Sequence, residues 1–154
     1  MSSYFIKQPK SDEDYKLYYY LRWELLRKPY DQVKGSEKDE YEDKAYHLMV
    51  TDLSNKVIGV GRLNKIKNEL DESVAQIRYM GISNEYQKKG LGTKILNKLE
   101  KYAYSNNFNK IILHSRESAI NFYKKNGYEV IKKTHILYDS IQHWMMSKNN
   151  NLNK

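Results

Sequence analysis

The alternation of hydrophobic and polar residues in the first third of the chain predicts a short strand followed by a helix. Residues 2–8 (SSYFIKQ) alternate as a strand does. A helix is expected from Ser11, its N-cap, because acidic residues fill the first turn and four apolar residues follow at helical spacing: Leu17, Tyr20, Leu21 and Leu25. Pro29 is expected to end this helix. The charged segment 31–44 predicts a loop with room for one helical turn.

Three segments in the middle of the chain have the apolar pattern of strands. Residues 45–53 (AYHLMVTDL) and 56–66 (KVIGVGRLNKI) predict a hairpin with its turn at Ser54–Asn55. Residues 74–82 (VAQIRYMGI) predict a third strand.

The second half of the chain predicts two helices and two further strands. A stripe of Leu91, Ile95, Leu99 and either Tyr102 or Ala103 indicates an amphipathic helix after a glycine-containing loop. Residues 110–115 (KIILHS) predict a buried strand. A shorter helix carries Ala119, Phe122 and Tyr123 on one side and ends at Gly127, where a C′ glycine is expected. The run from Ile136 to Met146 suits a final strand.

Length and composition favour one soluble domain. Residues 1–148 are expected to form it, and residues 149–154 to be a disordered tail. The absence of cysteine excludes disulfides and thiolate metal sites, and the four histidines lack metal-ligand spacing, so no metal is expected. Without an apolar N-terminal region or a stretch long enough to cross a bilayer, the protein is expected to be cytoplasmic.

The formal net charge of +8 suggests an anionic partner: nucleic acid, an anionic surface or a phosphorylated cofactor. A lysine-rich genome is the simpler explanation of the total. Nucleic acid ranks last, because the tyrosines form no stripe interleaved with cations. A lysine-rich genome does not, however, explain why cationic residues are concentrated at residues 79–93 (YMGISNEYQKKGLGT).

This segment has the layout of a strand, a basic glycine loop and a helix. It is not a P-loop, because Thr93 and Lys94 follow Gly92 in the wrong order, and Ile95 stands where a dinucleotide fingerprint needs a third glycine. Amides at a helix N-terminus nevertheless bind anions, and Gly90 and Gly92 would let the backbone approach one closely.

Two short motifs stand about 30 residues apart in the second half of the chain. Residues 87–92 (QKKGLG) match the pattern R/Q-x-x-G-x-G/A, and residues 119–128 (AINFYKKNGY) match A-x-x-F-Y-x-x-x-G-F/Y. Together and in this order, the two motifs resemble those of the GNAT superfamily of N-acetyltransferases. The segments 21–29 (LRWELLRKP), 57–63 (VIGVGRL) and 141–148 (IQHWMMSK) resemble a bacterial branch of this superfamily with unsettled substrates.

The resemblance implies an α/β (α+β) fold: a mixed sheet of six or seven strands with helices on both faces and a splay between the fourth and fifth strands. It implies that acetyl-CoA lies in the splay, with pantetheine bonded to a strand edge as an added strand would be. The implied cofactor-binding residues are Met80, Gly81 and Ile82 on the strand, then Gln87, Lys88, Lys89, Gly90, Leu91, Gly92 and Thr93 around the pyrophosphate, and Arg116, Ala119 and Phe122 near the second motif.

The chemistry of acetyl transfer from a thioester to an amine requires a base, a donor to the carbonyl oxygen and an acid for the departing thiolate. The resemblance assigns the acid to Tyr123 and the oxyanion donor to the amide of Met80 or Ile82. For the base, Glu24, Glu72, His143 and a water chain remain open, while His47 and His114 are expected to be structural.

The acceptor is less constrained by the sequence. Arg116 stands where many members of the superfamily have asparagine, and could form a local salt bridge or meet a phosphate or a substrate carboxylate. Arg22, Arg27 and Arg62 are further candidates to bind an acidic acceptor, although surface pairing with Glu or Asp is simpler. The resulting hypothesis is an N-acetyltransferase acting on a small-molecule or protein amine in a ternary complex, with a homodimer possible. The alternative is a coenzyme-A-binding or regulatory module that lost the chemistry.

Overall fold

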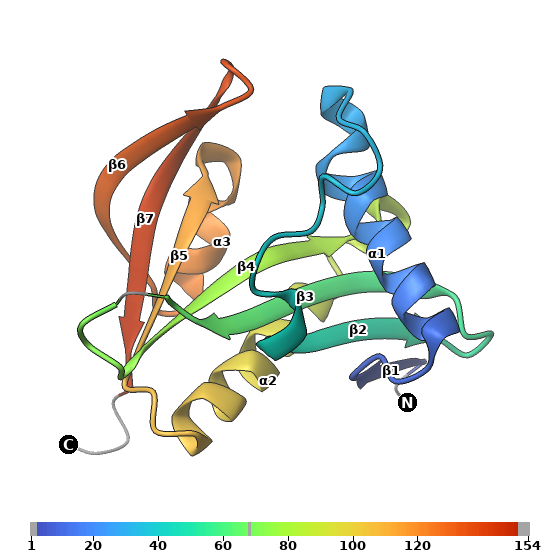
Figure 1. The fold of residues 1–154 in the computed structure, drawn as a ribbon, viewed down its shortest axis with the longest axis horizontal. Coiled ribbons are helices and arrows are strands. Elements are labelled where there is room, and N and C mark those ends of the chain that lie inside the picture. Colours follow the sequence, from blue (N-terminus) through green and yellow to red (C-terminus); the bar gives the residue numbers. More distant parts are fainter. Residues whose placement is uncertain (1–2, 68, 151–154) are drawn as a thin grey trace. The chain divides into compact units, whose positions relative to one another are not determined.

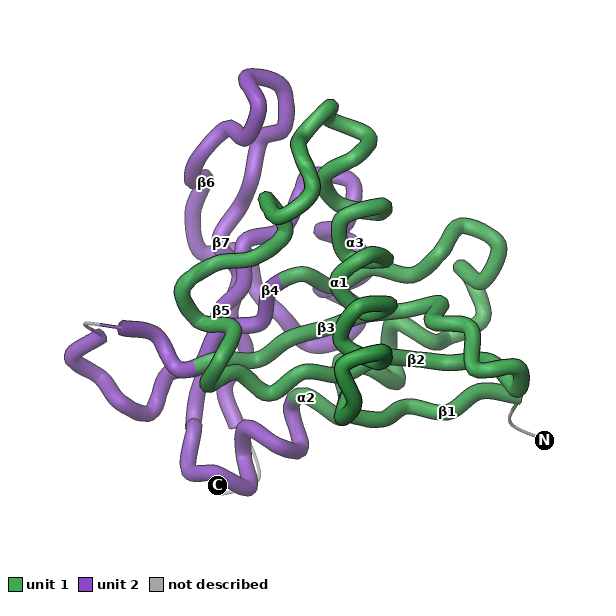
Figure 2. The backbone as a smooth tube through the Cα atoms, turned by 45° about the vertical axis from the view of Figure 1, so that its right-hand side comes forward, with its two compact units in different colours: residues 1–64, 79–99 green, residues 65–78, 100–154 purple. Residues whose placement is uncertain are grey.

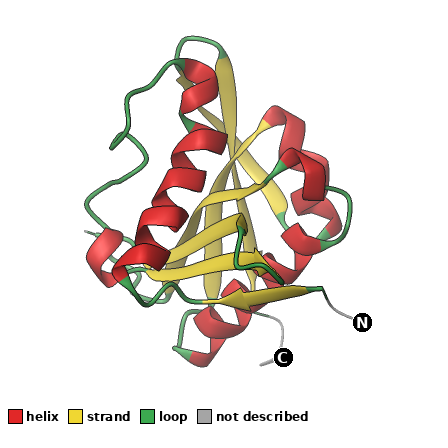
Figure 3. Cartoon of the chain, turned by 90° about the vertical axis from the view of Figure 1, so that its right-hand side faces the viewer, coloured by secondary structure: helices red, strands yellow, loops and turns green. Residues whose placement is uncertain are grey.

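The computed structural model describes residues 3–67 and 69–150 (Figure 1). Its seven strands form one mixed sheet in the order β1-β2-β3-β4-β5-β7-β6. The strands are β1 (Tyr4–Lys7), β2 (Tyr46–Asp52), β3 (Val57–Lys65), β4 (Val74–Ile82), β5 (Lys110–Arg116), β6 (Glu129–Leu137) and β7 (Ile141–Asn149). The α-helices are α1 (Asp12–Leu26), α2 (Leu91–Ser105) and α3 (Ile120–Lys125), and short 3-10 turns span Lys28–Tyr30, Glu42–Lys44, Asn84–Tyr86 and Glu117–Ala119 (Figure 3).

The chain divides into two compact units (Figure 2). The first unit comprises Met1–Asn64 and Tyr79–Leu99, and the second comprises Lys65–Arg78 and Glu100–Lys154. Strand β4 therefore begins in the second unit and ends in the first.

In the first unit, α1 begins as the sequence predicts. Ser11 Oγ accepts a hydrogen bond from the Asp14 amide at 3.0 Å, and Asp14 Oδ2 accepts from the Ser11 amide at 3.4 Å, which forms a capping box. The predicted apolar stripe is displaced, however. Leu17 and Tyr20 are 39% and 45% exposed, whereas α1 buries Tyr18, Leu21 and Arg22.

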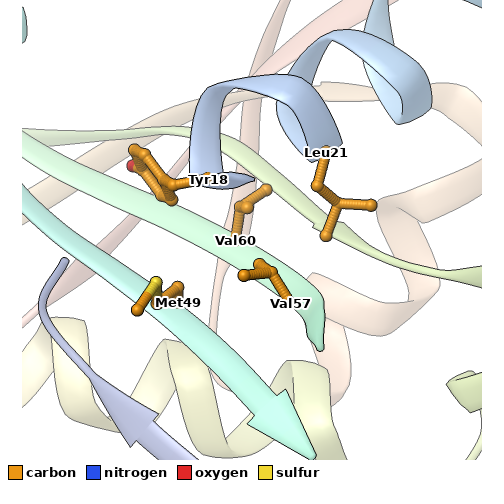
Figure 4. Packing of buried hydrophobic residues seen from close by; sticks show 5 residues of the cluster. All are labelled: Tyr18, Leu21, Met49, Val57 and Val60. Carbon is orange, nitrogen blue, oxygen red and sulfur yellow. The ribbon is translucent and has the colours of Figure 1, made fainter. Parts of the chain in front are cut away.

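Tyr18 and Leu21 of α1 pack on Met49 of β2 and on Val57 and Val60 of β3 (Figure 4). A side chain at Gly61 of β3 would enter the packing of α2, since its Cβ would lie 2.7 Å from Ile95 Cγ2. The buried stripe of α2 continues through Leu99 to Ala103, and Tyr102 is exposed.

In the second unit, two strands replace the single final strand predicted from Ile136 to Met146. Strand β7 begins at Ile141 and is paired on one side with β5 and on the other with β6. Tyr138 and Asp139 form the turn between β6 and β7 with φ of 53° and 58°. Strand β6 lies at the edge of the sheet, and most of its side chains are exposed. It was not predicted because it lacks the apolar pattern that indicates a strand.

The disordered tail was predicted to start at residue 149, which is too early in the chain. Asn149 belongs to β7 opposite Lys110, and the Asn150 amide donates to the Asn109 carbonyl at 2.8 Å. Residues 151–154 lie outside the described residues. Within the described chain, no helix is both long enough and apolar enough to cross a membrane.

Candidate active site

Strand β4 changes course part-way along its length. Within the described chain it pairs with β5 in parallel only from Val74, opposite Lys110, to Gln76, opposite Ile112. Three residues later, Tyr79 has a left-handed backbone with φ of 58°, which is rare for an aromatic residue and disrupts a regular ladder. The predicted pantetheine-binding stretch, Met80–Ile82, follows directly after this break.

Three arginine side chains of the first unit surround the ring of Tyr79. The guanidinium carbons of Arg22, Arg62 and Arg27 lie 4.3, 4.8 and 5.3 Å from the ring centroid. Such cation–π contacts are most favourable where water is excluded, and Tyr79 is 6% exposed. The arginines therefore stabilise the ring at the point where β4 leaves its regular course.

The charge of two of these arginines is balanced inside the first unit. Glu42 lies 2.8 Å from Arg22 Nη1 and 2.9 Å from Arg62 Nη1, and Asp39 lies 2.6 Å from Arg62 Nη1. Arg22 and Arg62 are both fully buried. The simpler expectation that Arg22 and Arg62 pair with acidic residues is therefore confirmed, but the pairs are buried and not at the surface. The alternative that these two arginines bind an acidic acceptor is wrong.

Arg27 also serves the fold. Its Nε donates to the Ser36 carbonyl at 3.1 Å, and the residue is buried. Its predicted role at an acceptor is therefore wrong as well.

His47 has the structural role that the sequence predicts. Its Nε2 donates to the Glu42 carbonyl at 2.7 Å, so in the neutral ring Nδ1 accepts from the Tyr18 hydroxyl at 2.8 Å. Burial lowers the pKa of His47, which keeps the ring neutral.

The loop before α2 offers an open backbone in the first unit. Gly90 has a φ of 81°, and a Cβ there would meet nothing within 4 Å. The first helical bond of α2 runs from the Lys94 amide to the Gly90 carbonyl at 3.1 Å, so the amides of residues 91–93 lie at the open N-terminal end. Lys88 and Lys89 are exposed beside them. This donor set fits a diphosphate.

Gln87 connects this loop to the end of β4. Its Nε2 donates to the Ile82 carbonyl at 3.0 Å and to Asn84 Oδ1 at 3.1 Å. The first motif therefore supplies a side chain that fixes the loop, in addition to backbone donors.

The second unit contains Tyr123, the predicted acid, on α3. Burial raises its pKa to about 12, and nearby Arg116 opposes this only in part. The ring contacts Phe122 and Tyr128, with centroids 5.1 and 5.8 Å away. Tyr123 is consequently protonated at neutral pH, as a proton donor must be.

His143 lies directly opposite Arg116 in the β5–β7 ladder. Its Nδ1 is 3.0 Å from the Ile141 carbonyl oxygen. A carbonyl only accepts, so the neutral ring carries its proton on Nδ1 and has a lone pair on Nε2. Burial lowers the pKa of His143, the hydrogen bond to the Ile141 carbonyl opposes this, and nearby His135, Arg116 and Arg78 lower the pKa further. His143 is therefore neutral and able to accept a proton.

The two carboxylates considered as bases differ in their surroundings. Glu72 precedes β4, is exposed and lies 3.3 Å from Lys65 Nζ, at the end of β4 that is paired with β5. Glu24 is half-buried on α1 in the first unit. The structure thus favours His143 over Glu72, and the role of Glu24 stays a prediction.

The sequence profile of the acetyltransferase (GNAT) family matches residues 12–128. This match covers most of the chain and includes both motifs. The chain belongs to the acetyltransferase (GNAT) family. The protein is accordingly an acetyltransferase, and the donor used by this family is acetyl-CoA.

Similar proteins agree with this assignment. The uncharacterized N-acetyltransferase YjcF of Bacillus subtilis is 29% identical over 139 residues, which cover 90% of this chain and 95% of the relative. An aminoglycoside 6′-N-acetyltransferase complexed with coenzyme A superposes with a TM-score of 0.77 at 14% identity, covering 94% and 96% of the chains. A spermidine N-acetyltransferase chimera from Vibrio cholerae and hSSAT gives 0.71 at 20% identity, covering 99% and 100%. These structures share the GNAT fold, and the predicted family and fold class are confirmed.

Sequence reasoning missed the surroundings of His114 in this GNAT protein. Its exposed ring lies on the opposite side of β5 from the buried Leu113 and Ser115, and its centroid is 5.5 Å from that of His135. The apolar surroundings expected for His114 are therefore wrong, and its structural role stays a prediction. The alternation along β5 was the available signal, because Ile112, His114 and Arg116 share one face.

Proposed function

We propose that this acetyltransferase transfers the acetyl group of acetyl-CoA to a primary amine by direct attack in a ternary complex. The observation that carries the proposal is the open, cationic loop of residues 87–93, which directly follows the irregular end of β4. It supports binding of a diphosphate next to a strand edge.

The cofactor-binding groups of the proposal come mainly from the first unit. The amides of Leu91, Gly92 and Thr93 and the charges of Lys88 and Lys89 would hold the two phosphates. Main-chain groups of Met80 and Ile82 would bind the pantetheine arm, with Gly81 between them. The cofactor-binding roles that the resemblance gives to Arg116, Ala119 and Phe122 of the second unit stay predictions.

Tyr123 and His143 would divide the proton transfers. Bound acetyl-CoA supplies the activated acetyl group and a thiolate leaving group. Tyr123 would donate the proton that this sulfur requires, because its hydroxyl is protonated at neutral pH. His143 would receive a proton from the acceptor at Nε2, because Nδ1 is bonded to Ile141. Neutralising a lysine-like amine at neutral pH costs roughly 4 kcal/mol, so a nearby base has a defined task.

The names of similar proteins support a general class of acceptor. Two structurally similar proteins are named as aminoglycoside and spermidine N-acetyltransferases, and both names refer to small amines. We therefore favour a small-molecule amine over a protein amino group.

Acetyl-CoA is expected to raise the melting temperature of the protein. A ligand at one hundred times its dissociation constant stabilises the native state by about 2.7 kcal/mol, which corresponds to a shift of about 5–10 °C for a chain of this size. Differential scanning fluorimetry measures this shift. Lys89→Glu should reduce it, because Lys89 lies in the loop, whereas Lys101→Glu on the exposed side of α2 is the matched control. No shift at millimolar acetyl-CoA would contradict the proposed binding mode.

A further inference from the structure

Three of the four histidines in the sequence lie together in the second unit. His135 of β6 stacks on His143 of β7, with ring centroids 4.6 Å apart and an interplanar angle of 12°. His114 of β5 lies 5.5 Å from His135, and its Nδ1 is 3.4 Å from Thr134 Oγ1. Three adjacent strands thus bring their imidazoles to one place.

Arginine side chains share this surface. In the β5–β7 ladder His114 is opposite Met145 and Arg116 is opposite His143, so these side chains lie on one face of the sheet. The opposite face carries the buried Leu113 and Ser115. On β4, Gln76 pairs with Ile112, and strand alternation places Arg78 on the same face as His114. We call Arg78, His114, Arg116, His135 and His143 the histidine–arginine face.

The largest charge effects on His114 and His143 come from basic groups. Burial lowers the pKa of His114 first, and His135, His143, Arg78 and Lys132 lower it further. Arg78 of β4 and Arg116 of β5 likewise oppose a charge on His143. The positive potential that resists protonation of these rings attracts an anion.

A metal cation does not suit the same surface. Imidazoles are common metal ligands, but the described residues contain no group of three or more His, Cys, Asp or Glu arranged to hold a metal ion. Two arginines and a lysine would also repel the ion. Carboxylates and phosphates, by contrast, match the geometry of guanidinium donors such as Arg78 and Arg116.

We propose that the histidine–arginine face binds an anionic group, a carboxylate or a phosphate ester, on the acceptor amine. This inference rests on the proposed function and narrows its acceptor class to amines that also carry a negative charge. Arg78 and Arg116 would hold the anion, and His143 on the same face would keep its Nε2 lone pair for the proposed proton transfer. The anion would therefore anchor the acceptor next to the base that takes its proton.

The direct test follows the histidine ring signals by NMR during titration with inorganic phosphate or acetate. Ionic strength is held constant with chloride. The signals of His114, His135 and His143 are expected to shift along a saturating curve, while His47, buried in the first unit, serves as the internal control. Arg78→Gln should weaken this binding about tenfold, as expected for the loss of one charge-assisted contact. Lys101→Gln, on the exposed side of α2, should leave it unchanged.

Shifts no larger than those caused by chloride would overturn the inference. This readout does not depend on acetyl transfer, so it decides the inference even if acetyl-CoA fails to bind.

A second experiment compares pairs of acceptor amines that differ only in one anionic group. One pair tests a phosphate ester and the other tests a carboxylate. Ethanolamine is compared with its phosphate ester, and β-alaninamide with β-alanine. The charged member of at least one pair should have the higher kcat/KM, by about tenfold, and Arg78→Gln should remove this preference through KM. Faster turnover of both neutral members would overturn the inference and leave the proposed acetyltransferase function intact.

Discussion

Glu42→Gln is expected to lower the free energy of unfolding by about 3–5 kcal/mol, because it removes the carboxylate between two buried arginines. Both oxygens of Glu42 are engaged: Oε1 with Arg22, and Oε2 with Arg62 and the Asp39 amide at 2.9 Å. Glutamine has the same shape but cannot balance two guanidinium charges, and its amide group presents a donor to one of them. The melting temperature should fall by about 6–20 °C.

The same substitution at Glu72 is the matched control. Glu72 pairs with Lys65 at 3.3 Å, and both side chains are largely exposed, so Glu72→Gln should change stability by less than about 1 kcal/mol. Urea unfolding of the two variants measures the contrast. Equal stabilities would show that the buried network does not contribute as described.

Tyr123→Phe is expected to lower kcat about 100-fold or more, with little change in acetyl-CoA affinity. The variant keeps the ring that packs on Phe122 and Tyr128 and removes only the hydroxyl group that carries the proton. General acid catalysis typically contributes 10²- to 10⁴-fold, and a group that acts only in the transition state changes kcat rather than binding. Steady-state kinetics with acetyl-CoA titration separates these two effects.

Tyr102→Phe controls for the loss of a tyrosine hydroxyl elsewhere. Tyr102 is 38% exposed on α2, and its variant should retain wild-type kcat. If Tyr123→Phe also retained full turnover, Tyr123 would have no acid role, and the proton would have to come from another group or from water.

The sequence correctly predicted the elements that have a clear local pattern, either a helix cap or a regular alternation of apolar and polar residues. Ser11 and Asp14 form the expected cap, β4 has its predicted bounds, and α2 carries its predicted stripe. Local chemistry determines these features, because capping, alternation and helical spacing each act over a few residues.

The errors arose where long-range contacts decide burial. Arg22 is fully buried on α1 because Glu42, twenty residues away, neutralises it, and this displaces the apolar stripe from Leu17 and Tyr20. No local pattern reveals such a partner. Strand β6 was missed because an edge strand with an exposed face lacks the apolar run on which strand prediction relies.

The candidate site was predictable in part. The glycine loop and the tyrosine of the second motif stand in contiguous sequence, so their motifs could be found directly. The left-handed Tyr79 and the grouping of His114, His135 and His143 depend on how separate strands pair, which becomes visible only in the folded chain.

The most direct test of N-acetyl transfer is a single assay that counts both products. Purified protein is incubated with acetyl-CoA and a panel of neutral, cationic and anionic primary amines, and free coenzyme A thiol and acetylated amine are quantified together. The account predicts that at least one amine gives both products in equal amounts, at a rate well above that without protein. Tight binding of acetyl-CoA with no thiol release above the uncatalysed rate for any amine would contradict it and indicate a coenzyme-A-binding module without transferase chemistry.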